Sequence, residues 1–363
     1  MKGGLQNRAG VVGLRKRFPN EGFIYKRKGG VRMVTIRDVA KRAGVAVSTV
    51  SKVINNYPSV SEDTIIRVNE AIEELHFIPN SVAASLSSKQ SGRVAVLTDP
   101  DGQTLASSEI MMQYIMGAVK AGNEARLDVV PLFFSMFAGM QVEEIEHRLE
   151  AQNIRSIIVC GLDRDMTALT QLIEREKFKS VVVDMPMEGE NTSNIGVDHA
   201  QAQKDILRKT ITENTGPSKS VLYISGRTNS YVTEERVRGA MELSEEIGFE
   251  LTVMNGEFSE KKAREITLKY GRDKDIIACG SDLMAIGAMK ALTDMNVFHP
   301  VCGFDGITLM GYAGKNMTTV RQNFSDIGEE ALRECCRLMG GDKGRSIRMP
   351  YTLMQVRYED VLE

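Results

Sequence analysis

The sequence lacks any run of apolar residues long enough to cross a bilayer, although 42% of its 363 residues are apolar. It contains only five cysteines and four histidines, and no cysteines stand at CxxC or Cys/His ligand spacing. We therefore predict no metal and no cofactor, and reduced thiols that lie mostly in the core. This pattern does not exclude a Cys/His nucleophile pair formed by residues that are distant in sequence.

Motifs of the common enzyme classes are also missing. The chain has no glycine-rich phosphate-binding loop, no nucleophile elbow and no acid/base pair in a clear structural context. These absences remove the support for a sugar-processing enzyme on an α/β scaffold. The sequence predicts a protein that is not an enzyme.

Charge is unevenly distributed along the chain. The formal net charge is only −2, but residues 1–93 contain sixteen lysines and arginines against seven acidic residues. A basic front end therefore precedes an acidic body.

The basic front end contains two short predicted helices separated by one glycine. Residues 36–43 have the spacing of an amphipathic helix, with an apolar face of Ile36, Val39, Ala40 and Ala43. Thr35 and Asp38 match a capping box, and Gly44 can supply the left-handed conformation that ends the helix. A second helix over about residues 46–54 can then fold back on the first, which is a helix-turn-helix pattern.

The second of these helices has an outward polar face. Its apolar side would hold Val50 and either Val53 or Ile54. The outward side would present Val47, Ser48, Ser51 and Lys52. Outward residues near the start of such a helix reach base edges in the major groove of DNA. The pattern predicts a DNA-recognition helix.

A third helix and a linker complete the front end. Ser61 is a predicted N-cap, and the buried stripe of the helix that follows is Val68, Ala71, Ile72 and Leu75. We expect residues 33–78 to form a compact helical head. Residues 79–92 open with proline and are rich in serine and alanine, so we expect them to form a hinge.

The first 32 residues carry nine basic side chains and one acidic side chain, and allow two interpretations. They could be a disordered basic arm that binds DNA, or a leader that is not translated. The second is favoured because codons for Lys28-Gly29-Gly30 can spell a ribosome-binding site shortly before Met33. Mass spectrometry of the native N-terminus distinguishes them, since peptides from before Met33 would contradict the leader.

The pattern changes from Arg93 onward. Amphipathic stretches such as 111–125 and 234–248 alternate with short β-rich runs, namely RVAVLT, LDVVPLF, SIIVCG, SVVVDM, SVLYISG, ELTVMNG, DIIACGS and PVCGFD. This alternation predicts parallel sheets covered by helices on both faces. The runs are too many for one sheet of ordinary size, so we expect two α/β lobes, with a ligand site at the carboxyl ends of the strands.

Polar residues follow several of the predicted strands. Those at strand ends or in the next helix are Asp99, Asp184, Arg236, Ser281, Asp282 and Asp305. Each alone is typical of a helix cap or its neighbourhood. Together, several carboxylates and one guanidinium around one crevice suit a small polyhydroxy ligand, whose hydroxyls donate to the carboxylates. Position alone leaves both interpretations open.

Several segments together resemble one family. TIRDVAKRAGVAVSTVSKVIN, VSEDTIIRVNEAIEEL, IPNSVAASL, SDLMAIGAMKAL, VCGFDG and MTTVRQNF resemble the lactose-repressor and galactose-repressor (LacI-type) family of bacterial transcription regulators, from Met33 to about Arg357. The resemblance implies a small all-α head and a two-lobed body like that of periplasmic binding proteins, over residues 93–363. It also implies crossings between the lobes near residues 196 and 320.

The resemblance also implies roles for individual residues. Val47, Ser48 and Lys52 match base-reading positions. Thr49, Ser51 and Asn55 match supporting or phosphate-contacting positions, and Leu86 matches a hinge residue that wedges into the minor groove. Asp184, Arg236, Ser281 and Asp305 match positions that commonly touch a sugar.

The chain departs from the family pattern at several of these places. Ala46, Lys52, Ala84 and Ser281 stand where the family usually has Ser, Arg, Arg and Asn. Residues 99–110 lack the family's Asn-Pro-Phe-Phe loop, which supplies apolar contact to a sugar ring. The identity of the ligand is therefore not carried over with the resemblance.

We expect a cytoplasmic, nucleoid-associated homodimer that binds operator DNA and acts as a repressor. A small sugar-like ligand bound between the lobes would control its affinity for the operator. A tetramer-forming heptad repeat is missing after Arg357. The alternative is a solute-binding protein of a sugar transport system, which would share the two-lobed body. That class requires a secretory signal, whereas this chain has a helix-turn-helix pattern near its start.

Overall fold

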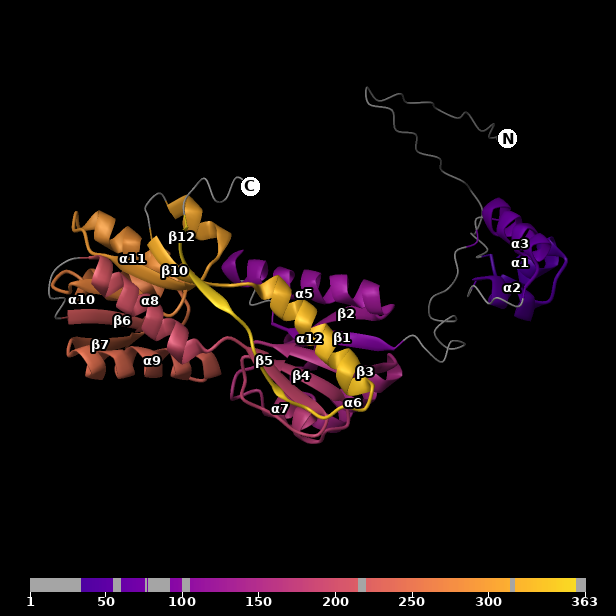
Figure 1. Cartoon of the computed structure of the whole chain (residues 1–363), viewed down its shortest axis with the longest axis horizontal. Coiled ribbons are helices and arrows are strands. Elements are labelled where there is room, and N and C mark those ends of the chain that lie inside the picture. Colours follow the sequence, from indigo (N-terminus) through magenta and orange to yellow (C-terminus); the bar gives the residue numbers. More distant parts are fainter. Residues whose placement is uncertain are drawn as a thin grey trace, which may run out of the picture. The chain divides into compact units, whose positions relative to one another are not determined.

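The computed structural model describes residues 34–54, 60–75, 77, 92–99, 105–214, 220–313 and 317–356. The chain divides into two compact units, Met1–Lys89 and Gln90–Glu363. We call the second unit the body (Figure 1).

The described part of the first unit contains three short helices. They are α1 (Ile36–Ala43), α2 (Val47–Ile54) and α3 (Glu62–Glu74). Val39, Val50 and Val68, one from each helix, are fully buried against one another. Gly44 has φ 67°, the left-handed conformation that turns the chain between α1 and α2. The predicted helical head with a helix-turn-helix is confirmed.

Two helix starts differ in how they are capped. The backbone amide and the hydroxyl of Thr35 both donate to Asp38 Oδ2, at 2.9 and 2.7 Å, so the reciprocal contact of the predicted capping box is present. Ser61 is the N-cap residue of α3, but its Oγ lies 2.9 Å from Thr64 Oγ1. The Ser61 hydroxyl therefore meets a side chain and not a backbone amide.

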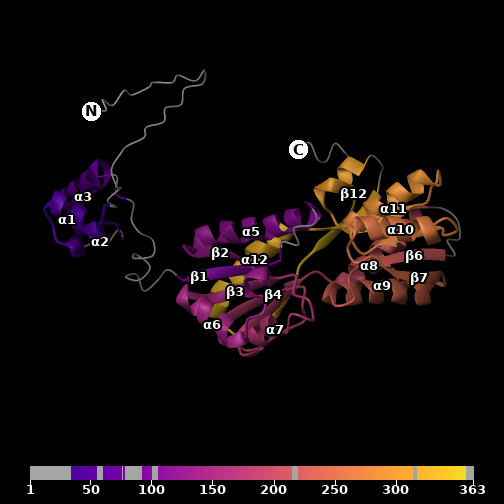
Figure 2. The same cartoon turned by 180° about the vertical axis from the view of Figure 1, so that it is seen from behind.

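The body contains two six-stranded sheets, one in each lobe (Figures 1 and 2). In the first lobe the strand order is β11-β5-β4-β3-β1-β2, with β1 (Arg93–Thr98), β2 (Asp128–Phe133), β3 (Ile154–Cys160), β4 (Lys179–Val183), β5 (Thr192–Gly196) and β11 (Ser346–Arg348). In the second lobe it is β12-β10-β9-β8-β6-β7, with β6 (Ser220–Ser225), β7 (Glu250–Asn255), β8 (Ile276–Cys279), β9 (Val301–Asp305), β10 (Met317–Gln322) and β12 (Tyr351–Val356). Neighbouring strands are parallel except β10 and β12, which are antiparallel. The predicted parallel sheets are confirmed, with this one edge as an exception.

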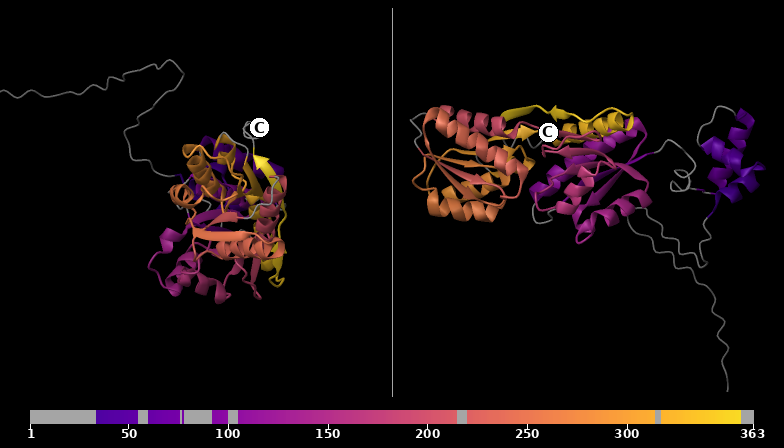
Figure 3. Two further views of the ribbon diagram at one scale, coloured as in Figure 1. Left: turned by 90° about the vertical axis from the view of Figure 1, so that its left-hand side faces the viewer. Right: turned by 90° about the horizontal axis from the view of Figure 1, so that it is seen from below.

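Helices cover both faces of each sheet (Figure 3). The first lobe has α5 (Leu105–Ala125) and α12 (Phe324–Met339) on one face and α6 (Val142–Ala151) and α7 (Thr167–Glu174) on the other. The second lobe has α8 (His199–Glu213) and α9 (Tyr231–Ile247) on one face and α10 (Glu260–Tyr270) and α11 (Asp282–Asp294) on the other. Two 3₁₀ helices, η1 (Phe134–Phe137) and η2 (Thr308–Ala313), follow β2 and β9. Central strands such as β1, β3 and β8 are consequently buried on both sides, which explains their continuous apolar runs.

The chain passes between the lobes three times. It crosses between β5 and α8, between β10 and α12, and between β11 and β12; the last passage is part of the yellow ribbon in Figure 1. The sequence analysis expected crossings near 196 and 320 and did not include the third. The sequence gives little indication of the third passage, because β11 has only three residues and none of them lies in an apolar run.

Helices α5 and α12 approach each other closely at two glycines. A Cβ on Gly117 would overlap the backbone carbonyl of Ser325, and a Cβ on Gly328 would overlap that of Tyr114. We expect Gly117→Ala to lower the free energy of unfolding by about 2–3 kcal/mol, because this collision outweighs the better helix propensity of alanine. Denaturant unfolding measures the change.

Gly92→Ala is the matched control for this glycine. A Cβ there would meet Leu127 and Met339 at ordinary contact distances of 3.6 and 3.9 Å. We expect it to change stability by less than about 1 kcal/mol. An equal loss in Gly117→Ala and Gly92→Ala would contradict the close-packing argument.

Candidate ligand-binding site

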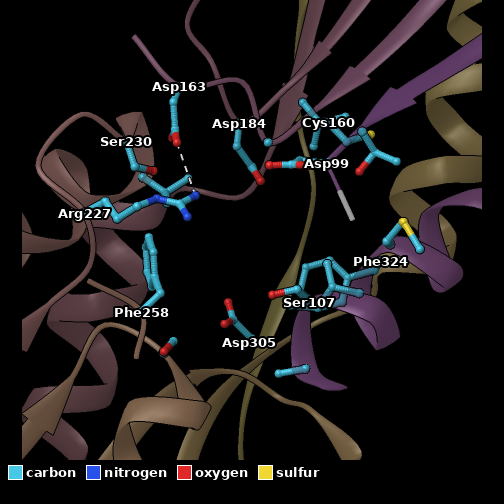
Figure 4. Close-up of a pocket in the computed structure, with 18 of the residues that line it drawn as sticks. Asp99, Ser107, Cys160, Asp163, Asp184, Arg227, Ser230, Phe258, Asp305 and Phe324 are labelled. Carbon is cyan, nitrogen blue, oxygen red and sulfur yellow. Dashed lines mark ion pairs between the residues drawn. The ribbon is translucent and has the colours of Figure 1, made fainter. Parts of the chain in front are cut away.

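A cavity of about 240 Å³ lies between the two lobes, at the carboxyl ends of their strands (Figure 4). The residues predicted from strand ends or from the family resemblance, Asp99, Asp184, Arg236, Ser281 and Asp305, all line it. Asp282 does not line it but lies directly behind it. The same arrangement brings in residues that the sequence analysis did not name, among them Tyr114, Arg227, Ser230 and Phe258.

Asp184 enters the cavity from the first lobe. It follows β4 with φ 62°, a conformation that aspartate tolerates better than most residues. A Cβ on Gly196 of the neighbouring strand β5 would overlap its carboxylate, so the glycine leaves room for this side chain. Asp184 Oδ1 lies 2.9 Å from Nε2 of His199, the first residue of α8. The predicted residue is therefore held by a histidine that sequence reasoning missed.

Arg236 is the buried cation at the second-lobe side of the site. It is 4% exposed, and its guanidinium carbon lies 3.7 Å from the centre of the Phe304 ring. Nη1 donates to Gly280 O at 2.5 Å, Nε to His199 Nδ1 at 3.3 Å and Nη2 to Asp305 Oδ1 at 3.2 Å. With three of its five N–H groups engaged, Arg236 chiefly orders the site and can still donate two hydrogen bonds.

Asp305 enters the cavity from the end of β9. Its Oδ1 accepts hydrogen bonds from Arg236 Nη2 and Gln322 Nε2, both at 3.2 Å. Burial raises the pKa of the Asp305 carboxyl, and the Arg236 guanidinium opposes this rise. The carboxylate is thereby oriented with one oxygen toward Arg236 and the other without a hydrogen-bond donor among the described residues.

Ser281 caps the N-terminus of α11 and also lines the cavity. Its side chain accepts a hydrogen bond from the Met284 amide at 3.4 Å, as the N-cap of α11. The cap interpretation from sequence therefore describes this contact. A hydroxyl that accepts from an amide still carries a proton that it can donate to a ligand.

Asp282 is fully buried behind the cavity and fixes the turn after β9. Its Oδ2 accepts from the amides of Gly306 and Ile307, at 2.7 and 2.8 Å, and its Oδ1 lies 2.5 Å from Thr319 Oγ1. Burial raises the pKa of this carboxyl well above its usual value. Asp282 thus supports the backbone that carries Asp305 into the cavity.

We expect the neutral amide Asp282→Asn to be tolerated within about 1 kcal/mol, because asparagine can accept both amides and donate to Thr319. Asp282→Ala leaves two buried amides without acceptors and should cost about 3 kcal/mol. Denaturant unfolding of both variants checks this. A larger loss for asparagine than for alanine would contradict a role that depends on the hydrogen bonds.

Contacts between the lobes flank the cavity. On one side Arg227 pairs with Asp163 at 3.2 Å, and the Arg164 amide donates to Asn229 O at 3.0 Å. On another, Glu109 Oε1 accepts from the amide and the hydroxyl of Thr308, at 2.9 and 2.7 Å. These contacts hold the lobes against each other, so a ligand that changes the cavity acts on how the lobes meet.

A second candidate site lies on α2 of the first unit. Val47 is 40% exposed, and Ser48 and Lys52 are also exposed, while Val50 and Val53 are buried. Thr49 and Ser51 are half-buried at the edge of this face. Asn55 and Leu86, the other predicted DNA-contacting residues, lie outside the described residues. Val47, Ser48 and Lys52 therefore face outward as the sequence pattern indicated, whereas Ser51, also expected there, is half-buried.

Metal and membrane features are absent from the described part of the chain. No group of three or more His, Cys, Asp or Glu side chains is arranged there to hold a metal ion. None of the described helices is both long and apolar enough to cross a membrane. All five cysteines are free thiols, and four of them are buried.

The fold and the cavity define a two-lobed ligand-binding protein of the periplasmic-binding-protein type, with a helix-turn-helix unit in the same chain. The family model "Bacterial regulatory proteins, lacI family" matches residues 35–80. The model "Periplasmic binding proteins and sugar binding domain of LacI family" matches residues 111–355. The chain belongs to the LacI family of bacterial regulatory proteins.

Relatives are similar over nearly the whole chain. Catabolite control protein A of Staphylococcus aureus (strain MRSA252) is 26% identical over 343 residues, covering 90% of this chain and 98% of the relative. The HTH-type transcriptional regulator AscG of Escherichia coli (strain K12) is 25% identical over 321 residues, covering 85% and 94%. Both relatives are named as regulators.

Solved structures share the fold. The lac repressor dimer bound to operator and the anti-inducer ONPF matches with a TM-score of 0.75 and 22% identity, covering 89% of this chain and 98% of that chain. The transcriptional regulator CelR in complex with cellobiose matches with a TM-score of 0.64 and 24% identity, covering 88% and 98%. At these identities the likeness establishes the fold alone.

Proposed function

We propose that the protein is a sequence-specific DNA-binding transcriptional regulator, acting as a repressor, whose affinity for operator DNA is controlled by a small sugar-like ligand. One observation carries this proposal: a single chain combines a helix-turn-helix with an outward polar face on α2 and a cavity built from both lobes of a binding-protein fold. The names of the relatives support it, since they are regulators, and so does a lac repressor structure that contains both operator and a ligand.

The head, residues 33–78, would place α2 in the major groove. Val47, Ser48 and Lys52 are exposed on α2 and would reach base edges. Thr49, Ser51 and Asn55 would contact phosphates or support the helix. Lysine donates to guanine acceptors as a point charge and lacks the bidentate fork of arginine, so discrimination at that base is expected to be modest.

Residues 79–92 would act as a hinge between head and body. Two copies of the chain would bind the two halves of a palindromic operator, and Leu86 from each copy would wedge into the minor groove at its centre. Residues 1–32 would be a leader that is not translated. The protein would act in the cytoplasm, at the nucleoid.

The body, residues 93–363, would bind the ligand and form the dimer. Asp184 and Asp305 offer carboxylate acceptors, Arg236 offers two remaining donors, and Ser281 offers a hydroxyl. The ligand would favour one arrangement of the lobes over another, and the hinge would transmit this population shift to the heads. The cavity would bind its ligand without chemical conversion.

A footprint and a binding titration test this function. Protein beginning at Met33 is titrated onto DNA upstream of its own gene and of neighbouring genes, at two salt concentrations. We expect two-fold symmetric protection and an affinity that falls steeply with salt, because phosphate contacts release counterions. Failure to protect any site, with and without added sugars, would refute the proposal.

A further inference from the structure

The cavity has an excess of negative charge. Five carboxylates and two guanidinium groups line it, namely Asp99, Asp163, Asp184, Glu257 and Asp305 against Arg227 and Arg236. Arg227 is already paired with Asp163 and Arg236 with Asp305, each at 3.2 Å. Each of these two cations therefore already has a carboxylate partner, and Glu257 pairs with Lys262 outside the lining.

One carboxylate oxygen of Asp184 meets a histidine and the other faces the cavity. Arg236 Nε donates to His199 Nδ1, so that nitrogen carries a lone pair and the ring proton lies on Nε2, which donates to Asp184 Oδ1. Asp184 Oδ2 accepts no hydrogen bond from the described residues, and Figure 4 shows the carboxylate pointing into the open space.

Asp305 faces Asp184 from the other lobe. Figure 4 shows the two carboxylates projecting toward the same space from opposite sides. Burial raises the pKa of the Asp305 carboxyl, and Arg236 and His199 oppose that rise. The charge of Asp184 adds a smaller rise, so the two carboxylates still repel each other across the cavity. Bringing the lobes together around an empty or neutral centre therefore works against this repulsion.

Two buried hydroxyls that line the cavity have no hydrogen-bond partner in the part of the chain that the structure describes. Tyr114 is 6% exposed and Ser230 is 8% exposed, and neither side-chain hydroxyl is hydrogen-bonded to any described residue. Burial raises the pKa of the Tyr114 phenol well above its usual value, so it stays protonated. Hydroxyls both donate and accept, which suits the hydroxyl groups of a ligand.

We propose that the ligand carries a protonated amino group on a polyhydroxy scaffold, as an amino sugar does, and that the amino group sits between Asp184 and Asp305. This inference specifies the chemical class of the ligand in the proposed function, and it rests on that function. A cation at this place satisfies the free carboxylate oxygens and screens the repulsion between the lobes. A neutral sugar leaves that repulsion in place, and a phosphorylated or acidic sugar adds to it.

Related polyhydroxy compounds of positive, zero and negative charge test the proposal. One set is tris(hydroxymethyl)aminomethane, pentaerythritol and 2,2-bis(hydroxymethyl)propionate, which are a cation, a neutral molecule and an anion of similar size. A second set is glucosamine, glucose and glucose 6-phosphate, with the corresponding galactose compounds. Dissociation constants are measured by calorimetry or NMR on the full chain, in a buffer that contains no amine.

We expect the amine to bind at least about tenfold more tightly than its neutral counterpart in one or both sets, and the anion most weakly, because a charge pair at a partly buried site outweighs a neutral hydrogen bond. In Asp184→Asn this preference should fall below about twofold. Asparagine also tolerates the positive φ at this position, so the variant should fold.

Asp294→Asn is the matched control. Asp294 is half exposed at the end of α11, where it pairs with Arg264 at 2.6 Å, and it does not line the cavity. We expect it to keep the full preference for the amine. The proposal is overturned if no amine of either set binds more tightly than its neutral counterpart, or if Asp184→Asn keeps the preference.

Operator binding is measured on the same preparations, so that failure of the amino-group proposal can be distinguished from failure of the proposed regulator function. Operator binding without any preference for amines would overturn the charge assignment and leave the regulator intact. A preference for amines without operator binding would overturn the regulator and support the charge assignment of the cavity.

Discussion

Arg236→Met should weaken binding of the ligand by at least about 100-fold and lower the free energy of unfolding of the body by about 3–5 kcal/mol. The change leaves Asp305 buried without its guanidinium partner and removes the donors to Gly280 O and His199 Nδ1. It also removes the stacking on Phe304. Denaturant unfolding, together with titration of the ligand that binds the unaltered chain most tightly, measures both losses.

Arg238→Met is the control for this variant, since it makes the same substitution two residues further along α9. Arg238 is half exposed and, among the described residues, pairs only with Glu235 and Glu242 on the surface of its own helix. Exposed pairs of this kind contribute at most about 1 kcal/mol. If the two variants lost equal stability and equal ligand affinity, the buried network would not be what orders the site.

Lys52→Glu should reduce operator affinity by about 100-fold or more while leaving ligand binding in the body unchanged. Lys52 is exposed on α2, beside the outward Ser48. The substitution removes a donor to base edges and places a negative charge against the phosphates. Competition titrations with operator and with unrelated DNA, at matched salt, separate the loss of specificity from the loss of general attraction.

Arg67→Glu changes the net charge of the head by the same amount but lies on α3. Its guanidinium makes only a long hydrogen bond to Thr64, at 3.5 Å, on the exposed side of that helix. We expect a loss of general affinity that depends on salt, with the ratio of operator to unrelated DNA retained. An equal loss of that ratio in both variants would exclude α2 as the element that reads sequence.

Much of the fold was predictable because its signals are local. Buried strands such as β3 and β8 have continuous apolar runs, and α1 ends where Gly44 takes its left-handed turn. Strands β5, β10, β11 and β12 were not among the predicted runs. Strands β5, β10 and β11 are largely polar or short, and β12 mixes apolar with polar residues. All four pair with a neighbouring strand that supplies hydrogen bonds, which a single segment does not reveal.

Some residues of the site were also predictable from local sequence, and others were not. Strand ends placed Asp184 and Asp305 near one crevice, since the carboxyl ends of parallel strands meet at one edge. No spacing in the sequence indicated that His199 would link Asp184 to Arg236, because the three residues come from different elements of two lobes. The hydroxyls of Tyr114 and Ser230 were equally hidden, as each lies on an element that looks like ordinary core or helix start.

The sequence by itself determined the class of protein: a helix-turn-helix head with an outward face on its second helix, and an α/β body with polar residues after its strands. These features follow from periodicity, glycine placement and strand composition, which act over a few residues. Only the tertiary structure decided the charge balance of the cavity, the link from Asp184 through His199 to Arg236 and the opposition of Asp184 and Asp305 across the lobes. Such properties depend on side chains far apart in the chain and on their burial together, and no local pattern encodes that.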